Sequence, residues 1–558
     1  MNITASLINV SKKHLLAIFF ALFCGVLVLA PQVIFIANEG DHYKGYYMMK
    51  TEAEWFYLAR MQEFYDEGRV GNPFLFEHKF YGPQFMQSGG EIILAAPGKL
   101  LGISIPTLNL IYKFVLPAIT FLLLYALIFR LTKSAPWSIA GGLMYILNPT
   151  WLYINNVSHL LQGDVSFFAD FLYSRPVHGT LDGIILFLYF NILLTLHTTR
   201  NVRWFVGLGA LLALSFYTYF YSFTFFLALN FVVVLLWLCC GKKREAGYLT
   251  LATIGGILIG IPKLLAIYAA YHHPDYPLLA VLQPVEHGRT PVISKNGLMV
   301  SLFFVIYLFR TKALRMVGII RDHSIFFLGL LITTFVVVNQ QVLTGISLFS
   351  GHYHHSFNIP IFVIALTFLA SAATAHFLHS EDTRSDVGVQ GGNTRWNLGE
   401  RFLRFHLVFP HLLRALPWLA AIIFIATGVF MQYAAYQNWA PQTSNEQRYM
   451  PALSWLRENT PKNSVVMANE ALSDIIPVFT SNNDMWSRGA PLFLVPLDRA
   501  RFTPENLLRS GDFLKDIKQY RVDYILWDQN IDPGWNIDRF HLPTLFSSEG
   551  LVIYELPK

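Results

Sequence analysis

Charged residues are scarce in this 558-residue chain, and cysteines are scarcer still. Only 14% of the residues are Asp, Glu, Lys or Arg, against roughly 25% in an average soluble domain. The three cysteines, Cys24, Cys239 and Cys240, all lie in apolar segments, so the sequence shows no disulfide framework and no cysteine-based metal site. A Walker loop, a dinucleotide-binding glycine motif and a zinc-protease helix motif are also missing. The sequence therefore gives no sign of a disulfide-stapled secreted domain or of a nucleotide-binding fold.

Apolar residues are abundant instead, at 54% of the chain, and aromatic residues make up 15%. A membrane-spanning helix needs about 17 to 25 mostly apolar residues. Segments of this kind lie near residues 14–37, 109–131, 136–154, 179–198, 246–270, 297–310, 324–340, 355–378 and 416–436. The stretch from Trp204 to Cys240 is too long for one helix and carries the polar aromatic segment "YTYFYS" in its middle, which predicts two spans. The chain is thus predicted to be an α-helical polytopic membrane protein.

Basic residues test this count, because Lys and Arg collect in the short cytoplasmic loops of membrane proteins. They occur at alternate turns: Lys12 and Lys13, Arg130 and Lys133, Arg200 and Arg203, Lys242 to Arg244, and Arg310 to Arg321. The alternation is consistent only if residues 204–240 cross twice. We therefore expect about eleven transmembrane helices, an uncleaved first span, a cytoplasmic N-terminus and an extracytoplasmic C-terminus in the plasma (inner) membrane.

The last 120 or so residues have a different, more polar composition that suits one small α/β domain. We expect residues 1–436 to form the transmembrane domain, with a large outside loop at 38–104, and residues 437–558 to form an extracytoplasmic α/β domain. Ser444 and Gln447 have the spacing of a capping box, which predicts the start of a helix there. The segments "SVVMA" and "VDYILWD" are typical of buried strands, and Thr503 followed by Pro504 predicts a helix start between them.

The outside loop at 38–104 is rich in carboxylates. Glu52 and Glu54 precede "WFYLARMQEFYDEG", which is predicted to be an amphipathic helix on the bilayer surface that ends at Gly68. The two carboxylates could simply stabilise the positive end of the helix dipole. Glu63, Asp66 and Glu67, further along the helix, are expected to lie on a solvated surface.

The segment "EWFYLAR" resembles the acidic, aromatic element in the first outside loop of the GT-C superfamily of membrane glycosyltransferases. That superfamily includes oligosaccharyltransferases, protein mannosyltransferases and aminoarabinose transferases. The wider phrase "EAEWFYLARMQEFYDEG" is similar to uncharacterised bacterial members, and the overall plan of spans and an outer C-terminal domain is similar too.

The resemblance implies transfer of a hexose or pentose, with inversion, from a polyprenyl-phosphate donor to a saccharide, lipid or protein acceptor on the outer face. It implies no partnership with nucleic acid and leaves a divalent cation possible. Glu54 would be the general base that removes the acceptor proton, with Glu52 as second choice, and Tyr57 and Arg60 would contact substrate. Members commonly have Asp at this place, whereas both candidates here are Glu, with Thr51 just before them. The identity of the base and the need for a metal therefore stay open.

A second acidic loop, "QGDVSFFADFLYSRPVHGTLDG", follows the third predicted span. The resemblance makes Asp170 a second catalytic carboxylate, whereas an interfacial hairpin with paired Asp and Arg is the alternative. Arg175 and His178 would bind the lipid phosphate, because cationic side chains give charge-assisted hydrogen bonds to phosphate oxygens. Asp182 lies at the outer end of the next span and is expected not to be deeply buried.

Two further positive groups are candidates for the same phosphate. Lys263 follows Pro262 inside a predicted span, where a lysine is costly and rarely persists without a partner or a function. It could bind phosphate, reach back to the interface, or form a structural ion pair. His352 and Tyr353 belong to "HYHH", which lacks the spacing and fourth ligand of a zinc site and could instead be part of an interfacial aromatic belt.

Two other classes of protein remain open from the sequence. A transporter or flippase for a lipid-linked saccharide would use Lys263 and Asp182 as contacts within the membrane, although transporters usually show two related halves that are not evident here. A membrane scaffold without catalytic activity would only display the C-terminal domain. Convergence of Glu54, Lys263 and His352 on one outward site would favour the enzyme.

Overall fold

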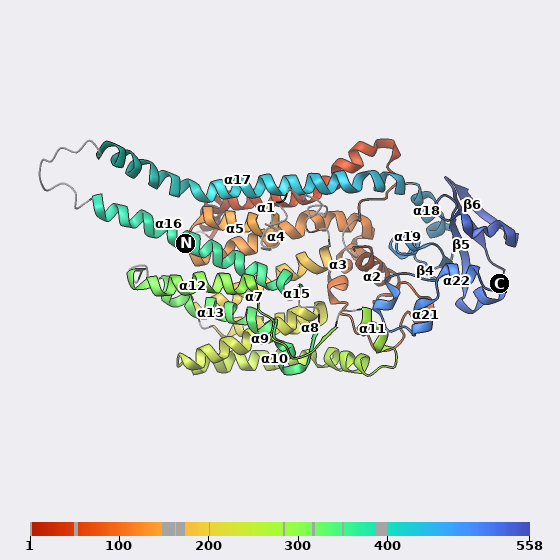
Figure 1. The fold of residues 1–558 in the computed structure, drawn as a ribbon, viewed down its shortest axis with the longest axis horizontal. Helices are drawn as coiled ribbons and strands as arrows, with labels where there is room; N and C mark the ends of the chain where they lie inside the picture. Colours follow the sequence, from red (N-terminus) through yellow and green to blue (C-terminus); the bar gives the residue numbers. More distant parts are fainter. Residues whose placement is uncertain are drawn as a thin grey trace, which may run out of the picture.

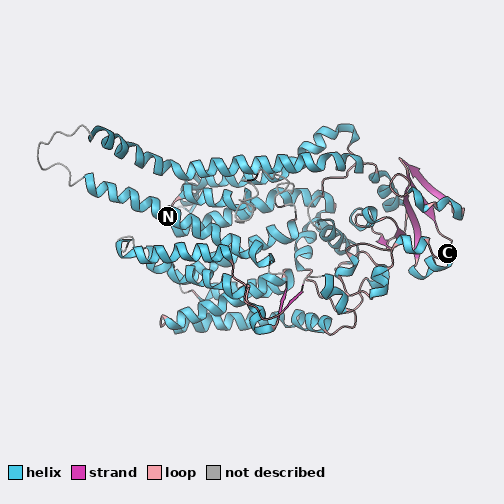
Figure 2. Ribbon diagram, in the orientation of Figure 1, coloured by secondary structure: helices cyan, strands magenta, loops and turns pink. Residues whose placement is uncertain are grey.

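The computed structural model describes residues 3–49, 54–147, 162, 173, 175–199, 201–282, 285–314, 319–348, 351–385 and 399–557. The molecule is elongated, with long helices running along its length and the C-terminal segment gathered at one end (Figure 1). Most of it is helical, and the larger of its two sheets lies at the C-terminal end (Figure 2). This division agrees with the predicted fold class, a helical membrane protein followed by a small α/β unit.

The long helices coincide with the predicted spans. They are α1 (Ile3–Glu39), α4 (Ile105–Thr132), α5 (Ala135–Leu147), α7 (Leu181–Thr199), α8 (Val202–Thr218), α9 (Phe220–Cys239), α10 (Lys243–Tyr271), α12 (Lys295–Leu314), α13 (Ile319–Val337), α16 (Ile359–Ser385) and α17 (Gly399–Glu446). Among the described residues, seven helices are long and apolar enough to cross a membrane, and three shorter helices are also apolar. The protein is therefore a multi-pass membrane protein, and the number of eleven spans stays a prediction.

The apolar stretch at 204–240 forms two helices, as predicted. α8 ends at Thr218 and α9 begins at Phe220, and Tyr219 between them has an extended backbone with φ −154° and ψ 126°. The break falls inside the polar aromatic segment "YTYFYS". It turns the Tyr219 side chain into the site described below.

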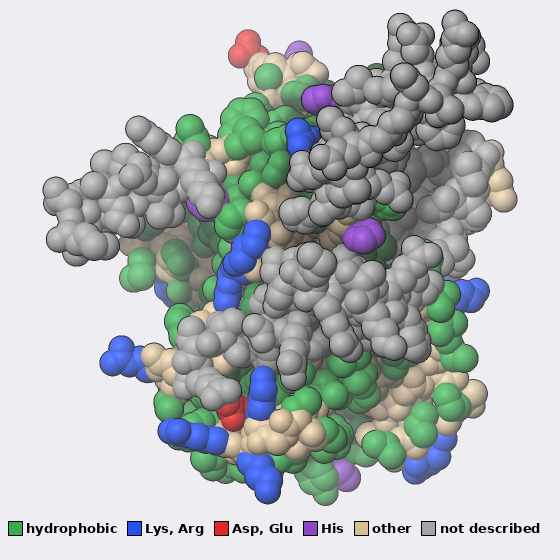
Figure 3. Space-filling model, turned by 90° about the vertical axis from the view of Figure 1, so that its left-hand side faces the viewer, with side chains coloured by type: hydrophobic (Ala, Val, Ile, Leu, Met, Phe, Trp, Pro, Cys, Tyr) green, Lys and Arg blue, Asp and Glu red, His purple; other side chains and the backbone are tan. Residues whose placement is uncertain are grey.

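The two ends of the molecule differ in character. The end opposite the C-terminal segment shows Lys and Arg side chains and few Asp or Glu side chains where it is not covered by grey atoms (Figure 3). A basic end of this kind is what the distribution of basic residues along the sequence predicts for a cytoplasmic face.

The C-terminal sheet contains β3 (Val465–Met467), β4 (Asn483–Asp484), β5 (Val522–Asp528), β6 (Thr544–Ser548) and β7 (Leu551–Glu555). Their order is β4-β3-β5-β7-β6, with β3 parallel to β4 and β5 and with antiparallel pairing from β5 to β7 and β6. The surrounding helices are α18 (Tyr449–Asn459), α19 (Glu470–Ser473), α20 (Ile476–Phe479), α21 (Leu497–Arg501), α22 (Pro504–Leu508) and α23 (Phe513–Asp516). Both predicted strands are confirmed.

The predicted helix starts of this region had different outcomes. Thr503 caps α22 by accepting a hydrogen bond from the Asn506 backbone, as predicted. The capping box at Ser444 and Gln447 is wrong, because Ser444 lies in the last turn of α17. The Gln447 side-chain amide instead donates to a backbone carbonyl of α17 and its oxygen accepts from the Lys44 backbone, so it joins the outer loop to α17.

The segment between α1 and α4 contains α2 (Glu54–Glu67) and α3 (Gly89–Leu101), which lie between the long helices and the C-terminal segment (Figure 1). α2 ends before Gly68, whose φ of +73° suits a glycine. Phe56, Leu58 and Met61 are at most 1% exposed within the protein. The prediction that α2 lies on the bilayer surface is therefore wrong, because other parts of the chain cover its apolar residues.

Candidate functional site

A cluster of aromatic and basic side chains forms where α2 meets the segment before α7. The Tyr57 ring stands edge-on to the His178 ring at 4.7 Å between centroids, and Arg175 Cζ lies 5.9 Å from the Tyr57 centroid. On its other side His178 packs against Tyr219 at 4.5 Å, with the rings inclined by 31°. We call this group, together with His352 and Asp182, the outer cluster.

His178 pairs with Asp182, one turn further along the chain. His178 Nδ1 lies 3.0 Å from Asp182 Oδ2. Asp182 is only 4% exposed, so the expectation that it would not be deeply buried is wrong, because His178 and its tyrosine neighbours cover the helix start. The backbone breaks at Gly179, with φ 114° inside the short segment η5 (Pro176–Thr180).

His352 joins the outer cluster from a distant part of the sequence. It lies on α15 (Gly351–Tyr353), and its Nδ1 is 3.0 Å from the Tyr219 hydroxyl. The Tyr221 ring packs on it at 4.6 Å. Four separate segments, around residues 57, 175–182, 219–221 and 352, thus converge.

Tyr353, the neighbour of His352, has a different environment. It is fully buried, and its hydroxyl lies 2.8 Å from Thr224 Oγ1 and accepts a hydrogen bond of 2.8 Å from Gln340 Nε2. These contacts fix α15 against α9 and α14 (Gln340–Thr344). Thr224 and Gln340 also line an apolar cavity of about 540 Å³ between α9, α13 and α14, with Leu227, Val336 and Leu343.

Arg60 lies two turns of α2 away from Glu54 and is 1% exposed. Its Nε lies 2.7 Å from Glu91 Oε1 on α3, but the N–H does not point at the oxygen, so the contact is an ion pair rather than a hydrogen bond. Arg60 also donates to the Gln87 carbonyl. Arg60 therefore ties α2 to the start of α3.

Lys263, on α10, binds the segment before α3 that Arg60 also binds. Its Nζ donates to the Gln84 and Met86 carbonyls, at 2.8 Å each, and the residue is 8% exposed. The ammonium group thus reaches out of the helix to backbone oxygens of the outer loop. This geometry satisfies two of its three donors without a carboxylate partner.

Glu54 is fully buried at the first turn of α2. Its Oε1 lies 2.8 Å from Lys113 Nζ and accepts a hydrogen bond of 2.7 Å from Asn109 Nδ2, both on α4. The pair links α2 to the membrane helices. Glu52 and Asp170, the other predicted carboxylates, lie outside the described residues.

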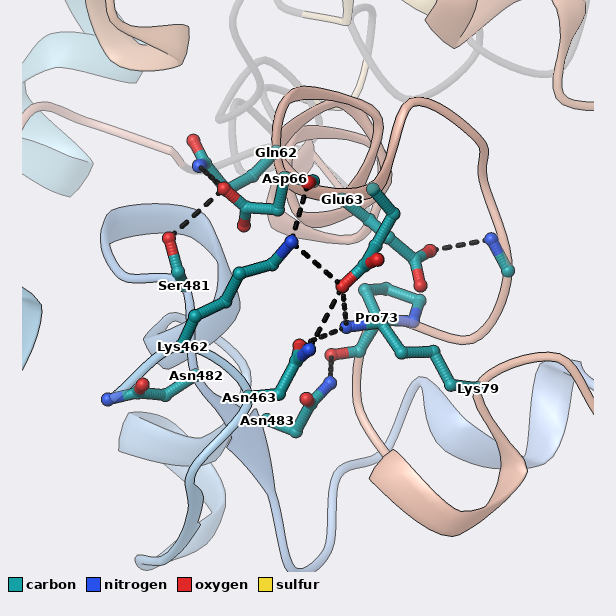
Figure 4. A network of polar contacts seen from close by, with 12 residues as sticks. Gln62, Glu63, Asp66, Pro73, Lys79, Lys462, Asn463, Ser481, Asn482 and Asn483 are labelled. Atoms are coloured by element: carbon teal, nitrogen blue, oxygen red, sulfur yellow. Dashed lines mark hydrogen bonds and ion pairs between the residues drawn. The ribbon is translucent and has the colours of Figure 1, made fainter. Parts of the chain in front are cut away.

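The three carboxylates expected on a solvated surface are instead part of a polar network (Figure 4). Asp66 accepts from Ser481 at 3.0 Å, and Glu67 accepts from Asn463 at 3.0 Å and pairs with Lys79 and Lys462 at 3.2 Å each. Glu63 is 4% exposed and accepts a hydrogen bond of 2.6 Å from the Gly71 backbone. The prediction that these carboxylates lie on a solvated surface is wrong, because the C-terminal domain and the loop after α2 cover this side of the helix.

Glu63 and Glu67 have opposite electrostatics in this network. Burial raises the pKa of Glu63 to about 7, and the Gly71 hydrogen bond only partly offsets it. Burial also acts against ionisation of Glu67, but its hydrogen bond from Asn463 and the charges of Lys79 and Lys462 lower its pKa to about 2.

No three His, Cys, Asp or Glu side chains come together in a metal-binding arrangement within the part of the chain that the structure describes. The possible divalent cation thus has no identified ligands among these residues.

Sequence reasoning missed several residues of these sites. Lys113 and Glu91 were overlooked because each partner comes from a different segment, and no local pattern links them. Tyr219 had a signal, since "YTYFYS" is a polar aromatic interruption of an apolar stretch.

No protein-family model matches the sequence, and no curated protein matches it either. Solved structures do resemble it. ArnT from Cupriavidus metallidurans bound to undecaprenyl phosphate is similar over 98% of this chain and 98% of its own, with 11% identity and a TM-score of 0.49. The archaeal oligosaccharyltransferase AglB from Archaeoglobus fulgidus, with an inhibitory peptide and a dolichol-phosphate, matches over 98% and 75%, with 13% identity and a TM-score of 0.43.

A further structure of the Archaeoglobus fulgidus oligosaccharyltransferase, in complex with Zn and sulfate, matches over 92% of this chain and 68% of its own, with 10% identity and a TM-score of 0.46. ArnT and AglB are both GT-C glycosyltransferases, the superfamily that the sequence resembles. At these identities and TM-scores the likeness describes an overall arrangement, and activity has to be argued from the residues of this chain.

Proposed function

We propose that the protein is an integral-membrane glycosyltransferase of the GT-C kind that transfers a sugar from a polyprenyl-phosphate donor on the outer face of the membrane. The observation that supports it is the outer cluster. Tyr57, Arg175 with His178, and His352 were predicted as substrate contacts from three separate loops, and they lie in one chain of contacts that runs through Tyr219. A scaffold would have no need to bring them together.

The side chains of the outer cluster suit a glycosyl phosphate. Arg175 would bind the phosphate of the leaving group through charge-assisted hydrogen bonds, and the His352 imidazole would add a further hydrogen bond. Tyr57, Tyr219 and Tyr221 offer ring faces and hydroxyls, which suit the mixed apolar and polar surface of a sugar. The apolar cavity beside Tyr353 would take part of the lipid chain.

The remaining predicted residues take supporting or open roles in this proposal. Arg60 and Lys263 would hold the loop at 84–87 next to the site rather than touch the phosphate, because their donors already bind its carbonyls. Glu54 would fix α2 to α4 through Lys113. Glu52 and Asp170 would bind the acceptor or a divalent cation, and the C-terminal domain (437–558) would position the acceptor.

The activity is tested with purified protein in liposomes and a panel of polyprenyl-phosphate hexoses and pentoses. The proposal expects release of polyprenyl phosphate and a new glycoside with at least one donor. Movement of the lipid-linked sugar between leaflets without any bond cleavage would overturn the proposal and establish the transporter instead.

The outer-face location is tested separately with topology reporters. A reporter fused after Lys558 should be active only outside the cytoplasm, and one inserted at residue 391 should be active only inside. A cytoplasmic signal from the C-terminal fusion would contradict the proposed location of the site.

A further inference from the structure

The pairing of His178 with Asp182 has the geometry that orients a catalytic histidine. His178 Nδ1 contacts Asp182 Oδ2 at 3.0 Å, and Asp182 is 4% exposed. We infer that His178, oriented by Asp182, is the general base that removes the acceptor proton in the proposed transfer. This inference rests on the proposed function and replaces Glu54 in that role.

The pair determines which ring nitrogen is basic. In the proposed arrangement Asp182 accepts the hydrogen bond from His178, which places the shared proton on His178 Nδ1. The neutral imidazole then has its free lone pair on Nε2. Among the described residues Nε2 makes no hydrogen bond, and 10% of the His178 side chain is exposed, which would let an acceptor hydroxyl approach it.

Neighbouring side chains hold the imidazole in place. Tyr57 packs edge-on against it at 4.7 Å and Tyr219 lies against its face at 4.5 Å, so the ring has little freedom to turn. The Tyr219 hydroxyl is itself fixed by His352 Nδ1 at 3.0 Å. A base must be held within hydrogen-bond reach of the proton it takes, and this packing supplies that order.

Gly179 makes the turn that brings His178 back onto Asp182. Its φ of 114° is a conformation that residues with a Cβ rarely adopt, although no atom of the described residues lies within 4 Å of a Cβ built there. Backbone strain is therefore the obstacle that the described residues show to a side chain at this position. Unusual backbone of this kind is concentrated at functional sites.

Glu54 is less suited to the same task. Its carboxylate is fully buried, and Oε1 is already engaged by the Lys113 ammonium and the Asn109 amide. With these partners in place, Glu54 Oε1 would have to give up a contact with Lys113 or Asn109 before it could take the acceptor proton.

The step balances without a further reagent. The acceptor oxygen forms a bond to the anomeric carbon while its proton moves to His178 Nε2. The bond from the anomeric carbon to the phosphate oxygen breaks, and its electron pair leaves with the polyprenyl phosphate. His178 then loses the proton to the released phosphate or to water.

The test uses the full-length protein in liposomes with a donor that the unaltered protein accepts. His178→Ala should lower transfer at least about 100-fold, and added imidazole should restore part of it, which a purely structural histidine would not allow. Asp182→Asn should also lower transfer, and the double variant should be no worse than His178→Ala alone, because Asp182 acts only through His178 as a positioning residue. Gly179→Ala should lower transfer while donor binding persists.

His273→Ala is the matched control, since His273 also lies beside an aspartate, with Nδ1 3.5 Å from Asp275 Oδ2, outside the outer cluster. It should keep its rate. Full transfer by His178→Ala, or a loss that imidazole does not reduce in a variant with unchanged melting temperature, would overturn the role of His178 while leaving the proposed function in place. Absence of transfer by the unaltered protein with every donor would overturn both.

Discussion

The two sides of α2 present similar residues to very different surroundings. On the bundle side, which we define by Glu54, Tyr57 and Arg60, charged groups are at most 1% exposed and are held in single pairs with α3 and α4. On the domain side, defined by Glu63, Asp66 and Glu67, the carboxylates meet the loop after α2 and the C-terminal domain in a branched network (Figure 4). One short helix thus connects the membrane helices, the outer cluster and the C-terminal domain.

The comparison shows that a carboxylate's role depends on its partners rather than on its position in a motif. Glu54 has a buried ammonium partner, Glu67 has one buried lysine (Lys79) and one exposed lysine (Lys462), and Glu63 has only a backbone N–H within the described contacts. The expected cost of altering these groups falls from Glu54 to Glu63 to Glu67.

The largest effect is expected at the buried pair. Lys113→Met removes the cation beside Glu54 and should lower the free energy of unfolding by about 3 to 5 kcal/mol, because it leaves a buried carboxylate without that counter-charge. The melting temperature of the detergent-solubilised protein measures this loss. The double variant Glu54→Gln/Lys113→Met should recover part of it.

An exposed ion pair provides the control for that substitution. Lys44 pairs with Glu549 while 35% of its side chain is exposed, and Lys44→Met should cost no more than about 1 kcal/mol. Equal losses of stability for Lys113→Met and Lys44→Met would contradict the claim that the buried ion pair contributes more than the exposed one.

A smaller effect that depends on pH is expected at Glu63. Its pKa is raised from 4.5 to about 7 in the folded protein, so the folded state binds more protons than the unfolded state between these values. The stability from this group is complete below about pH 4.5 and is lost as the pH rises through about 7, by no more than about 3 kcal/mol. Glu63→Gln should therefore lose less stability than the unaltered protein between pH 5 and pH 8.

Melting temperatures at several pH values measure the effect. Glu458→Gln, at a carboxylate with 66% of its side chain exposed, should leave the pH dependence unchanged. A Glu63→Gln profile that matches the unaltered protein would show that Glu63 is not held in its protonated form.

The smallest effect is expected at Glu67. Its lowered pKa means that its contribution is present above about pH 4.5 and is lost as the pH falls towards about 2. Because its partner Lys462 is 44% exposed, solvent screens part of this network, and Glu67→Gln should cost less than about 1 kcal/mol at pH 7. Chemical denaturation at pH 7 measures it, and a loss above 3 kcal/mol would place Glu67 with the buried pairs.

The sequence predicted features that depend on local patterns. The break at Tyr219, the end of α2 before Gly68, the strand at 522–528 and the cap at Thr503 all follow from neighbouring residues. Apolar segment length also predicted where the long helices lie.

Features that depend on distant partners could not be predicted in the same way. Glu63 and Glu67 look like the exposed side of an amphipathic helix until Gly71 and Asn463 are placed beside them. From the sequence, Asp182 is expected to be exposed at the outer end of a span. Its burial becomes evident only when the break at Gly179 places His178 against it. Burial and pairing of charges are properties of the tertiary fold, and single-sequence patterns do not record them.

Two arginines on opposite sides of α2 allow the most direct test of where the site lies. Arg175 Cζ lies 5.9 Å from the ring centroid of Tyr57 on the bundle side, and Arg488 Cζ lies 5.7 Å from that of Trp55 where α2 meets the C-terminal domain. The measurement is the rate of polyprenyl phosphate release by Arg175→Met and Arg488→Met as the donor concentration is varied.

If the bundle side holds the donor phosphate, Arg175→Met should need at least about ten times more donor to reach the same rate. A tenfold weaker binding corresponds to a loss of about 1.4 kcal/mol, which one charge-assisted hydrogen bond can supply. Arg488→Met should need less than about twice as much, since Arg488 makes no substrate contact in the proposed site. Equal donor requirements for the two variants, or a larger requirement for Arg488→Met, would contradict the location of the site on the bundle side of α2.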